Sequence, residues 1–187
     1  MITRSEALDL LKRYLRDEKM VKHCIAVEAI MRALAKRLGR DEELWGLVGL
    51  LHDIDYDVTN RDLSRHGLEA TNILRGLLPE EALKAIACHN ENTGVEPETE
   101  EGKTMCIALR AADHMSGLIV ATALVMPNKK IEEIKLSTLK RKFKSKDFAR
   151  GVKRERILGI EKLGIPLDEF MQLALEAMKG IARELGL

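Results

Sequence analysis

Aromatic residues are scarce in this chain of 187 residues, which has one Trp, two Tyr and three Phe, or 3% in all. The core therefore has to be built from Leu, Ile, Val, Ala and Met, because apolar residues still supply 45% of the sequence. The same scarcity argues against a nucleic-acid surface, since single-strand binding surfaces combine basic grooves with aromatic stacking platforms. The length fits one domain, or one domain with an extension.

Cysteine is also too sparse to build a framework. The chain has three cysteines and no C-x-x-C pair; they are Cys24, Cys88 and Cys106. An odd number of cysteines without such a pair predicts neither a disulfide scaffold nor a zinc ribbon. The simplest interpretation of this pattern is a protein kept in a reducing compartment. The N-terminus lacks the apolar stretch of a signal peptide, and the longest apolar run, Gly117–Met126, is too short to span a bilayer. We therefore expect a cytoplasmic protein without a membrane partner.

Strand patterns are missing as well, because no run alternates convincingly with period two, whereas apolar residues recur at helical spacing almost everywhere. The sequence therefore predicts an all-α fold. Helices are expected at about 3–16, 18–38, 42–52, 64–75, 79–89 and 103–125, with one or two in the basic segment that follows and a last one from 167 to 187. The expected terminal signals are the capping box of Thr3 and Glu6, the N-caps Asp41, Ser64 and Asp168, and the C′ glycine Gly39.

One boundary is predicted near Pro127, which stops the sixth helix. It divides the chain into a helical domain at 1–126 and a basic C-terminal helical extension at 127–187 that packs on it. The final helix is expected to pack on the bundle or to form a homodimer contact, and the sequence leaves both open.

Charge is abundant but unevenly distributed. Charged residues make up 33% of the chain, and the net charge is only +1. The segment from Lys129 to Arg156 has 12 Lys or Arg against 4 Asp or Glu, so the rest of the chain is acidic. Such a segment is either a solvated helix face or a surface that meets a phosphate-bearing ligand.

The histidines lie in the most informative stretches. There are five of them: His23, His52, His66, His89 and His114. Any one alone reads as a surface or satisfied core histidine. However, LLHDIDYD places His52 and Asp53 at the end of an apolar helix, and LRAADHMSGLIVA places Asp113 inside another. A carboxylate there is costly to bury unless it is paired, caps a helix or binds a cation.

Imidazole and carboxylate side chains together suit Fe, Mn, Co, Ni or Zn, while Mg²⁺ prefers oxygen ligands. A helical bundle can bring such ligands together in its core from several helices. Because no thiolate is among these residues, an open site that keeps water is favoured over a closed structural zinc site.

At this point the chain resembles the HD superfamily of metal-dependent phosphohydrolases, which are helical bundles named for a His-Asp pair. The family order H…HD…D matches His23, then His52-Asp53, then Asp113, and the resemblance covers roughly 18–126. It implies that these four residues bind a first metal and that Asp53 takes part in catalysis.

Some branches of the superfamily add two histidines between the pair and the last aspartate, and bind a second metal. His66 and His89 occupy those places. The motifs RHGLEA, HNENTG and AADHMSG resemble the dinucleoside-polyphosphate hydrolases and the uncharacterised HDIG-labelled proteins. The resemblance implies a cofactor of one or two divalent transition-metal ions, with Asp53 bridging them if there are two.

The chain departs from two better-known branches. The HDIGK lysine and the GYP motif are absent, and a His-His pair is replaced by His89-Asn90, so cyclic-di-GMP hydrolysis is not expected. Where many 5′-nucleotidases have the glutamate of HD-x-x-E, this chain has Tyr56. Asp55 or Asp57 is left as an alternative proton donor.

The resemblance implies hydrolysis of a phosphate ester or phosphoanhydride in a nucleotide or another small phosphorylated molecule. Lys140, Arg141 and Lys144 are the expected substrate-binding groups, and Lys22 is a further candidate. A di-iron oxygenase with the same ligands and a nucleotide-sensing module without turnover remain alternatives. Nucleic acid is a weaker alternative that rests on the basic segment alone. His114 is expected to be structural, and Cys24 and Cys88 are expected to be small core residues.

Overall fold

The computed structural model describes residues 1–187 and is all-α, as the sequence predicts. Its helices are α1 (Arg4–Tyr14), α2 (Glu18–Leu38), α3 (Glu42–Leu51), α4 (Leu68–Leu74), α5 (Glu80–His89), α6 (Glu100–Leu124), α7 (Leu136–Lys144), α8 (Arg154–Leu158), α9 (Leu167–Lys179) and α10 (Ala182–Leu185). Three short 3₁₀ turns lie at Glu91–Thr93, Ile131–Glu133 and Gly159–Leu163.

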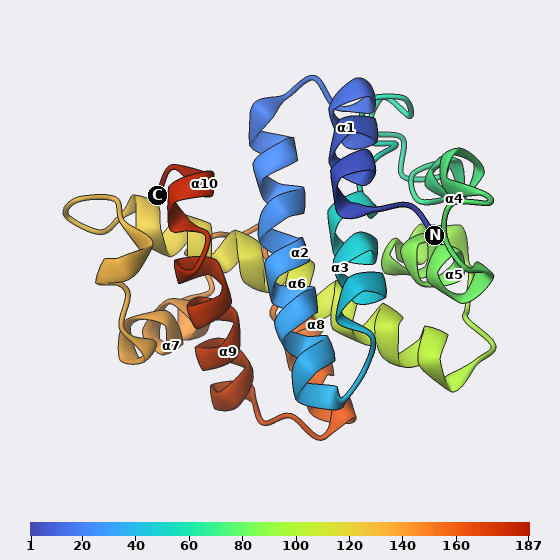
Figure 1. The fold of residues 1–187 in the computed structure, drawn as a ribbon. Helices are drawn as coiled ribbons and strands as arrows, with labels where there is room; N and C mark the ends of the chain where they lie inside the picture. The colour runs from blue at the N-terminus through green and yellow to red at the C-terminus, as the bar shows by residue number, and fades with distance from the viewer.

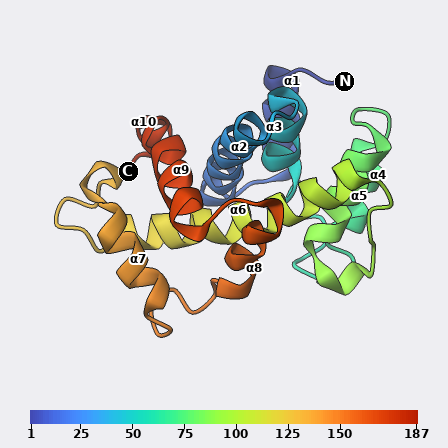
Figure 2. The ribbon, with the colours of Figure 1, turned by 90° about the horizontal axis from the view of Figure 1, so that it is seen from below.

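Helix α6 is the axis of the molecule. It crosses the whole bundle, with α4 and α5 near its first half and α7, α9 and α10 near its second half (Figure 2). By length and composition α6 is apolar enough to cross a membrane, but 56% of its most apolar window is buried inside the protein. We therefore describe α6 as the core helix of the bundle.

Helix α2 packs against α3, α6 and α9, with α1 and α3 on one side and α9 on the other (Figure 1). Its contact with α3 is unusually close at Gly49. A Cβ at that position would stand 2.9 Å from the backbone of Glu28, so only glycine allows this approach. The close contact matters because α3 ends immediately before the His52-Asp53 pair.

A buried carboxylate joins α1 to α2. Glu28 is only 3% exposed and accepts hydrogen bonds from Arg4 through both its oxygens, at 2.7 and 2.9 Å, and from Arg32 at 3.0 Å. The paired geometry compensates the cost of burying the charge. The predicted capping box of Thr3 and Glu6 begins α1, and Asp41 caps α3 as expected.

Three predicted N-termini differ from the structure. Ser64 does not cap α4, since its side chain bonds Asp62, and the helix begins after Gly67. Helix α6 starts at Glu100 rather than near Lys103, because Thr99 accepts a hydrogen bond from the Gly102 N–H and acts as the cap. Asp168 does not cap α9, since its carboxylate pairs with Lys140.

The segment after Pro127 folds back along the bundle. Helices α7 and α8 pack on α6, and α9 packs on α2, α6 and α7. An ion pair between Arg37 on α2 and Glu169 on α9 joins these two helices. Helix α10 packs on α2, so the C-terminal residues lie beside the N-terminal half of that helix (Figure 1).

The structure contains one disulfide bond, so the expectation that Cys88 is only a small core residue is wrong. Cys88 at the end of α5 is bonded to Cys106 in α6, with Cα atoms 6.1 Å apart, and Cys24 is free and buried. Sequence spacing cannot reveal such a pair, because the two cysteines meet only once α5 has turned back onto α6. The bond closes a loop across a separation of 18 residues and lies next to His89.

We expect loss of this bond to destabilise the protein. Removing a crosslink of this loop length costs about 3 kcal/mol in the chain-entropy account. The Cys88→Ser/Cys106→Ser variant should unfold at lower urea concentration than the oxidised wild type, and reductant should shift the wild type but not the variant. Cys24→Ala is the matched control and should keep the response to reductant. A wild-type midpoint that is indifferent to reductant would contradict the prediction.

Candidate metal centre

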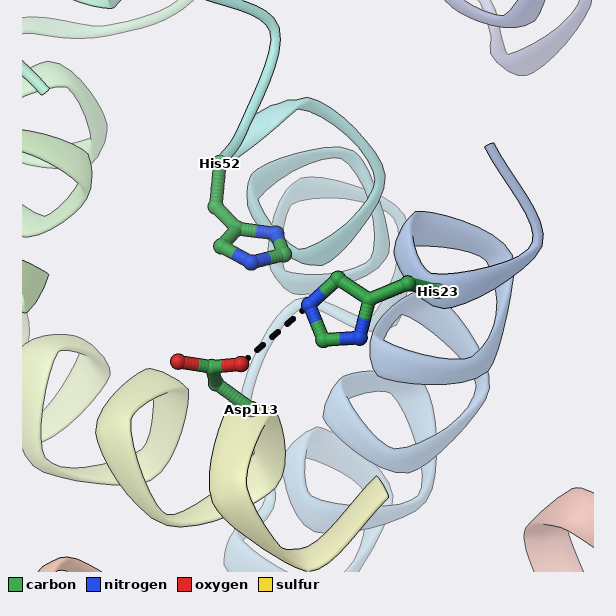
Figure 3. A group of neighbouring side chains, drawn as sticks. All are labelled: His23, His52 and Asp113. Carbon is green, nitrogen blue, oxygen red and sulfur yellow. Dashed lines mark ion pairs between the residues drawn. The ribbon is translucent and has the colours of Figure 1, made fainter. Parts of the chain in front are cut away.

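Three ligand-type side chains meet where α2, α3 and α6 cross. His23 comes from α2, His52 follows the last residue of α3, and Asp113 comes from the middle of α6, and the three point toward one another (Figure 3). The Nε2 of His23 lies 3.2 Å from Oδ1 of Asp113. These three residues form one of two groups in this chain whose ligand atoms are close enough to hold a metal ion.

Asp53 lies between two sets of imidazoles. Its Oδ2 is 3.5 Å from Nε2 of His23 and 3.3 Å from Nε2 of His52. Its Oδ1 is 3.2 Å from Nε2 of His66 and 3.4 Å from Nε2 of His89. One carboxylate thus faces two separate half-sites, and together with Asp113 the structure brings all six predicted ligand residues into one cluster.

Each of the four histidines is oriented by a partner on its other nitrogen. The Nδ1 of His52 lies 2.8 Å from the carbonyl of Gly49, and that of His89 bonds the carbonyl of Ile86. The other two bond side chains: the Nδ1 of His66 contacts Asp55 at 2.8 Å, and the Nδ1 of His23 contacts Ser116 at 3.4 Å. All four Nε2 atoms are therefore directed into the cluster, as metal-binding histidines usually are.

Asp55 has a supporting place in this arrangement. It is fully buried, and besides His66 it accepts hydrogen bonds from the N–H groups of Gly67 at 2.7 Å and Ala70 at 2.9 Å. Its two oxygens are thus engaged away from the cluster's interior, so it does not serve as the alternative proton donor. Asp57 accepts a hydrogen bond from the N–H of Arg16 at 2.8 Å and forms no hydrogen bond or ion pair with the cluster.

The loop that carries His66 is pinned against α5. Asn90, the residue after His89, donates hydrogen bonds to the carbonyls of Leu63 at 2.7 Å and of His66 at 2.9 Å. Gly67 has φ +89°, and a Cβ there would stand 3.2 Å from the carbonyl oxygen of Ala87. The glycine therefore lets the loop lie close enough to α5 for His66 and His89 to come within 3.1 Å.

The cluster holds protons when no metal is present. Burial opposes protonation of His52, but the Asp53 and Asp113 carboxylates outweigh it and raise the pKa to about 9. For His66 burial is likewise outweighed by Asp53 and Asp55, and the pKa rises to about 10. Burial alone would raise the pKa of Asp53, but the surrounding imidazoles lower it well below its ordinary value.

The donor set fits a divalent transition metal. His52 Nε2 is buried and has no hydrogen-bond partner, although Asp53 Oδ2 is 3.3 Å away. A buried polar atom without a partner is costly, and a metal ligand bond would satisfy it. Imidazoles and carboxylates without a thiolate suit Fe, Mn, Co or Ni.

The side chains of the cluster differ in their exposure to solvent. The side chains of His23 and Asp113 are 23% and 27% exposed, whereas those of His52, His66 and His89 are between 0% and 9%. The cluster is therefore most accessible to solvent at His23 from α2 and Asp113 from α6.

The basic residues expected at the substrate do not bond the cluster. Lys140 forms an ion pair with Asp168 at 2.6 Å. Arg141 is exposed on α7, and Lys144 lines a separate hollow of about 390 Å³ with Arg150 and other residues of the basic segment. Their contact with a substrate stays a prediction.

Other cations lie nearer to the ligands. Lys22 shares a cleft with His23. Arg110 is one helical turn before Asp113 and donates to the carbonyl of Cys88 at 3.1 Å.

His114 accepts a hydrogen bond from the Lys153 N–H at 3.2 Å, in keeping with its expected structural role.

Sequence reasoning missed the residues that hold the ligands in place. Asp55 was considered only as a proton donor, and Ser116 and Asn90 were not assigned to the histidines they support. Spacing offers a signal for two of them, because Ser116 is one turn after Asp113 and Asp55 lies two residues after Asp53. No spacing reveals that Asn90 reaches the loop before α4.

Comparison with known protein families gives one match: the family model of the HD domain matches residues 20–116, more than half of the chain. The match contains all six residues of the cluster. No solved structure matches the chain.

We expect Asp55→Asn to weaken the half-site of His66 and His89 selectively. The amide cannot accept from both the His66 ring and the two backbone N–H groups as the carboxylate does, and loss of such outer partners typically lowers metal affinity about 10–100-fold. The metal-free protein is titrated with metal, and calorimetry measures the binding.

Asp57→Asn is the matched control, because this carboxylate lies two residues away and bonds Arg16 instead. It should bind metal like the wild type. Equal weakening in both variants, or in neither, would show that Asp55 does not position His66. Thermal unfolding of both metal-free variants separates this effect from general destabilisation.

Metal binding should release protons and tighten as pH rises. Metal needs neutral imidazole, whereas the raised pKa values keep His52 and His66 protonated at neutral pH in the metal-free protein. Apparent affinity should therefore increase with pH and level off near the two pKa values, about 9 and about 10. Calorimetry in buffers of different ionisation enthalpy counts the released protons, and an affinity independent of pH between neutrality and these values would contradict the prediction.

Proposed function

The chain belongs to the HD domain family, and from that premise we propose that it is a metal-dependent phosphohydrolase acting on a small phosphorylated molecule. Proteins with an HD domain are typically metal-dependent hydrolases that bind divalent metals, and the His/Asp cluster is compatible with that chemistry. The proposal goes further by assigning residues and a reaction.

The observation that carries the proposal is the position of Asp53. Each of its oxygens faces a different pair of histidines, at 3.2 to 3.5 Å. We assign His23, His52 and Asp113 to one ion, His66 and His89 to a second, and Asp53 to both. With ions bound, these residues would hold a two-metal site, and such a site would supply charge stabilisation for an in-line attack on phosphorus.

When bound, a divalent metal supplies the acidity that makes water a nucleophile near neutral pH. The chain's own residues orient the ligands and limit the access of water. Gly49, Ile86, Asp55 and Ser116 keep the four imidazoles turned inward through the bonds described above. The nearly complete burial of His52, His66 and His89 keeps bulk water away from that part of the cluster.

The open side carries positive charge for the phosphoryl oxygens. Lys22 lies in α2 immediately before His23, and its only ion pair is with the exposed Glu18 at 3.6 Å. An exposed i,i+4 pair of this kind is weak, so Lys22 is free to turn to an anion. Lys140, Arg141 and Lys144 are proposed to raise the local concentration of anionic substrates from further away.

The alternative of a di-iron oxygenase uses the same ligands, and the alternative of a sensing module uses the same cleft. No residue of the structure favours either one over hydrolysis. Comparison of product formation with and without O₂ separates the oxygenase from the hydrolase, and tight binding without product identifies the sensor.

The test is metal analysis and phosphate release in the wild type and in Asp53→Ala. We expect the wild type to bind about two ions of Fe or Mn per chain, in line with a bridging carboxylate. It should release phosphate from at least one member of a panel of nucleotides and simple phosphate esters. Asp53→Ala should lose both metal and activity.

Asp57→Ala is the matched control and should keep both properties. Failure of the wild type to bind Fe, Mn, Co or Ni after soaking would overturn the proposal. So would full metal occupancy without release of phosphate from any ester, in which case O₂-dependent turnover or tight ligand binding would identify the alternatives.

A further inference from the structure

An apolar cleft continues from the candidate metal centre. It has a volume of about 550 Å³ and is bounded by α2, α6 and the C-terminal segment around α10. His23 belongs to both the cluster and the cleft. A volume of this size is typical of a small-molecule site.

One wall of the cleft is an unbroken extension of the ligand face of α6. Gly117, Val120, Ala121 and Leu124 line it, and they follow Asp113 at helical spacing. Residues at such intervals share one face of a helix. From Asp113 to Leu124 this face is about 16 Å long, at the rise of an α-helix.

The opposite walls come from α2 and the C-terminal segment. Lys19 and Lys22 lie on the same side of α2 as His23, and all three residues line the cleft. Lys19 forms no ion pair. A Cβ on Gly186 would stand 3.5 Å from Nζ of Lys22, which places the C-terminal segment directly beside the lysine.

The residues that line the cleft suit a substrate with an aliphatic group better than a nucleotide. Apart from His23, no ring side chain and no Asn or Gln lines the cleft, so it offers neither a stacking surface nor an amide to read a nucleobase. What it offers is an aliphatic floor that follows Asp113 along α6, and two cations from the part of α2 that carries His23. Leu124, at the far end, is 50% exposed, a large apolar side chain without a partner.

We infer that the substrate of the proposed phosphohydrolase is a phosphate monoester of an aliphatic alcohol, with the phosphate at the metal centre and the chain along the α6 face to Leu124. In the reaction, the oxygen of water bonds to phosphorus and the bond from phosphorus to the alcohol oxygen breaks. The alcohol leaves with one proton of the water, and inorganic phosphate is the other product. The inference rests on the proposed function.

The first test is binding, which does not depend on turnover. Methyl-, butyl- and octylphosphonate are titrated by calorimetry into the full-length, metal-loaded protein, below the concentration at which octylphosphonate forms micelles. Burial of each methylene should tighten binding by up to roughly fourfold. Equal affinity for all three phosphonates would overturn the inference.

Two variants locate the chain within the cleft. Ala121→Phe should block the middle of the α6 wall and abolish the preference for octyl- over methylphosphonate. Leu124→Glu should weaken octylphosphonate roughly tenfold, because the far end of the chain loses its apolar contact. Val125→Glu is the matched control, since Val125 is 55% exposed but outside the cleft, and it should bind like the wild type. Equal weakening in Leu124→Glu and Val125→Glu would overturn the assignment.

Hydrolysis of the matching phosphates, with AMP alongside, completes the test. Preference for octyl phosphate over both AMP and methyl phosphate supports the inference. Preference for AMP overturns it while the proposed function stands. Chain-length-dependent binding without release of phosphate from any ester overturns the proposed function, and the cleft is then a binding site for aliphatic anions.

Discussion

The arrangement of the whole bundle depends on one buried carboxylate that must serve two sets of imidazoles. Asp53 is 7% exposed, and both of its oxygens lie within 3.5 Å of histidine nitrogens. Such a group is unfavourable in an apolar core unless positive charge surrounds it on every side. Protons can supply that charge, as the raised pKa values of His52 and His66 indicate, and so can metal ions. The same geometry therefore explains why the core tolerates the cluster and why the cluster favours cations.

That geometry depends in turn on two close backbone approaches made possible by glycine. Gly49 brings α3 against α2, so that the His52-Asp53 pair ends beside His23. Gly67 brings the loop before α4 against α5, so that His66 reaches His89. A Cβ would stand 2.9 Å from the backbone of Glu28 at Gly49 and 3.2 Å from the carbonyl oxygen of Ala87 at Gly67, so a side chain at either position would push the neighbouring segment away. Packing and chemistry are thus coupled at these two contacts.

The sequence was sufficient for the fold class and for the residues of the cluster, because both follow from local pattern. Helical periodicity predicts α2 at its observed bounds, and the order of His23, His52-Asp53 and Asp113 indicates the family. The sequence could not predict the features that depend on contacts between distant segments. The Cys88–Cys106 bond, the hydrogen bonds of Asn90 to the loop before α4, and the pairing of Lys140 with Asp168 all join residues whose proximity no spacing predicts. Capping was the other weak point, since Ser64 and Asp168 have the right side chains but other partners compete for them.

Two different parts of α6 line the polar cluster and the apolar cleft. The first part of the α6 face carries Asp113 and faces a polar cluster, and the next turns, from Gly117 to Leu124, are aliphatic. The geometry of the cluster tolerates little change, because six side chains meet there within hydrogen-bonding distance of one another. The aliphatic turns touch no ligand except through His23, so their side chains can change in size without disturbing the cluster. Specificity for the organic part of a substrate would therefore be determined by the second half of α6 and by the C-terminal segment. This division follows from the length of α6, whose 25 residues extend well beyond the metal centre on both sides.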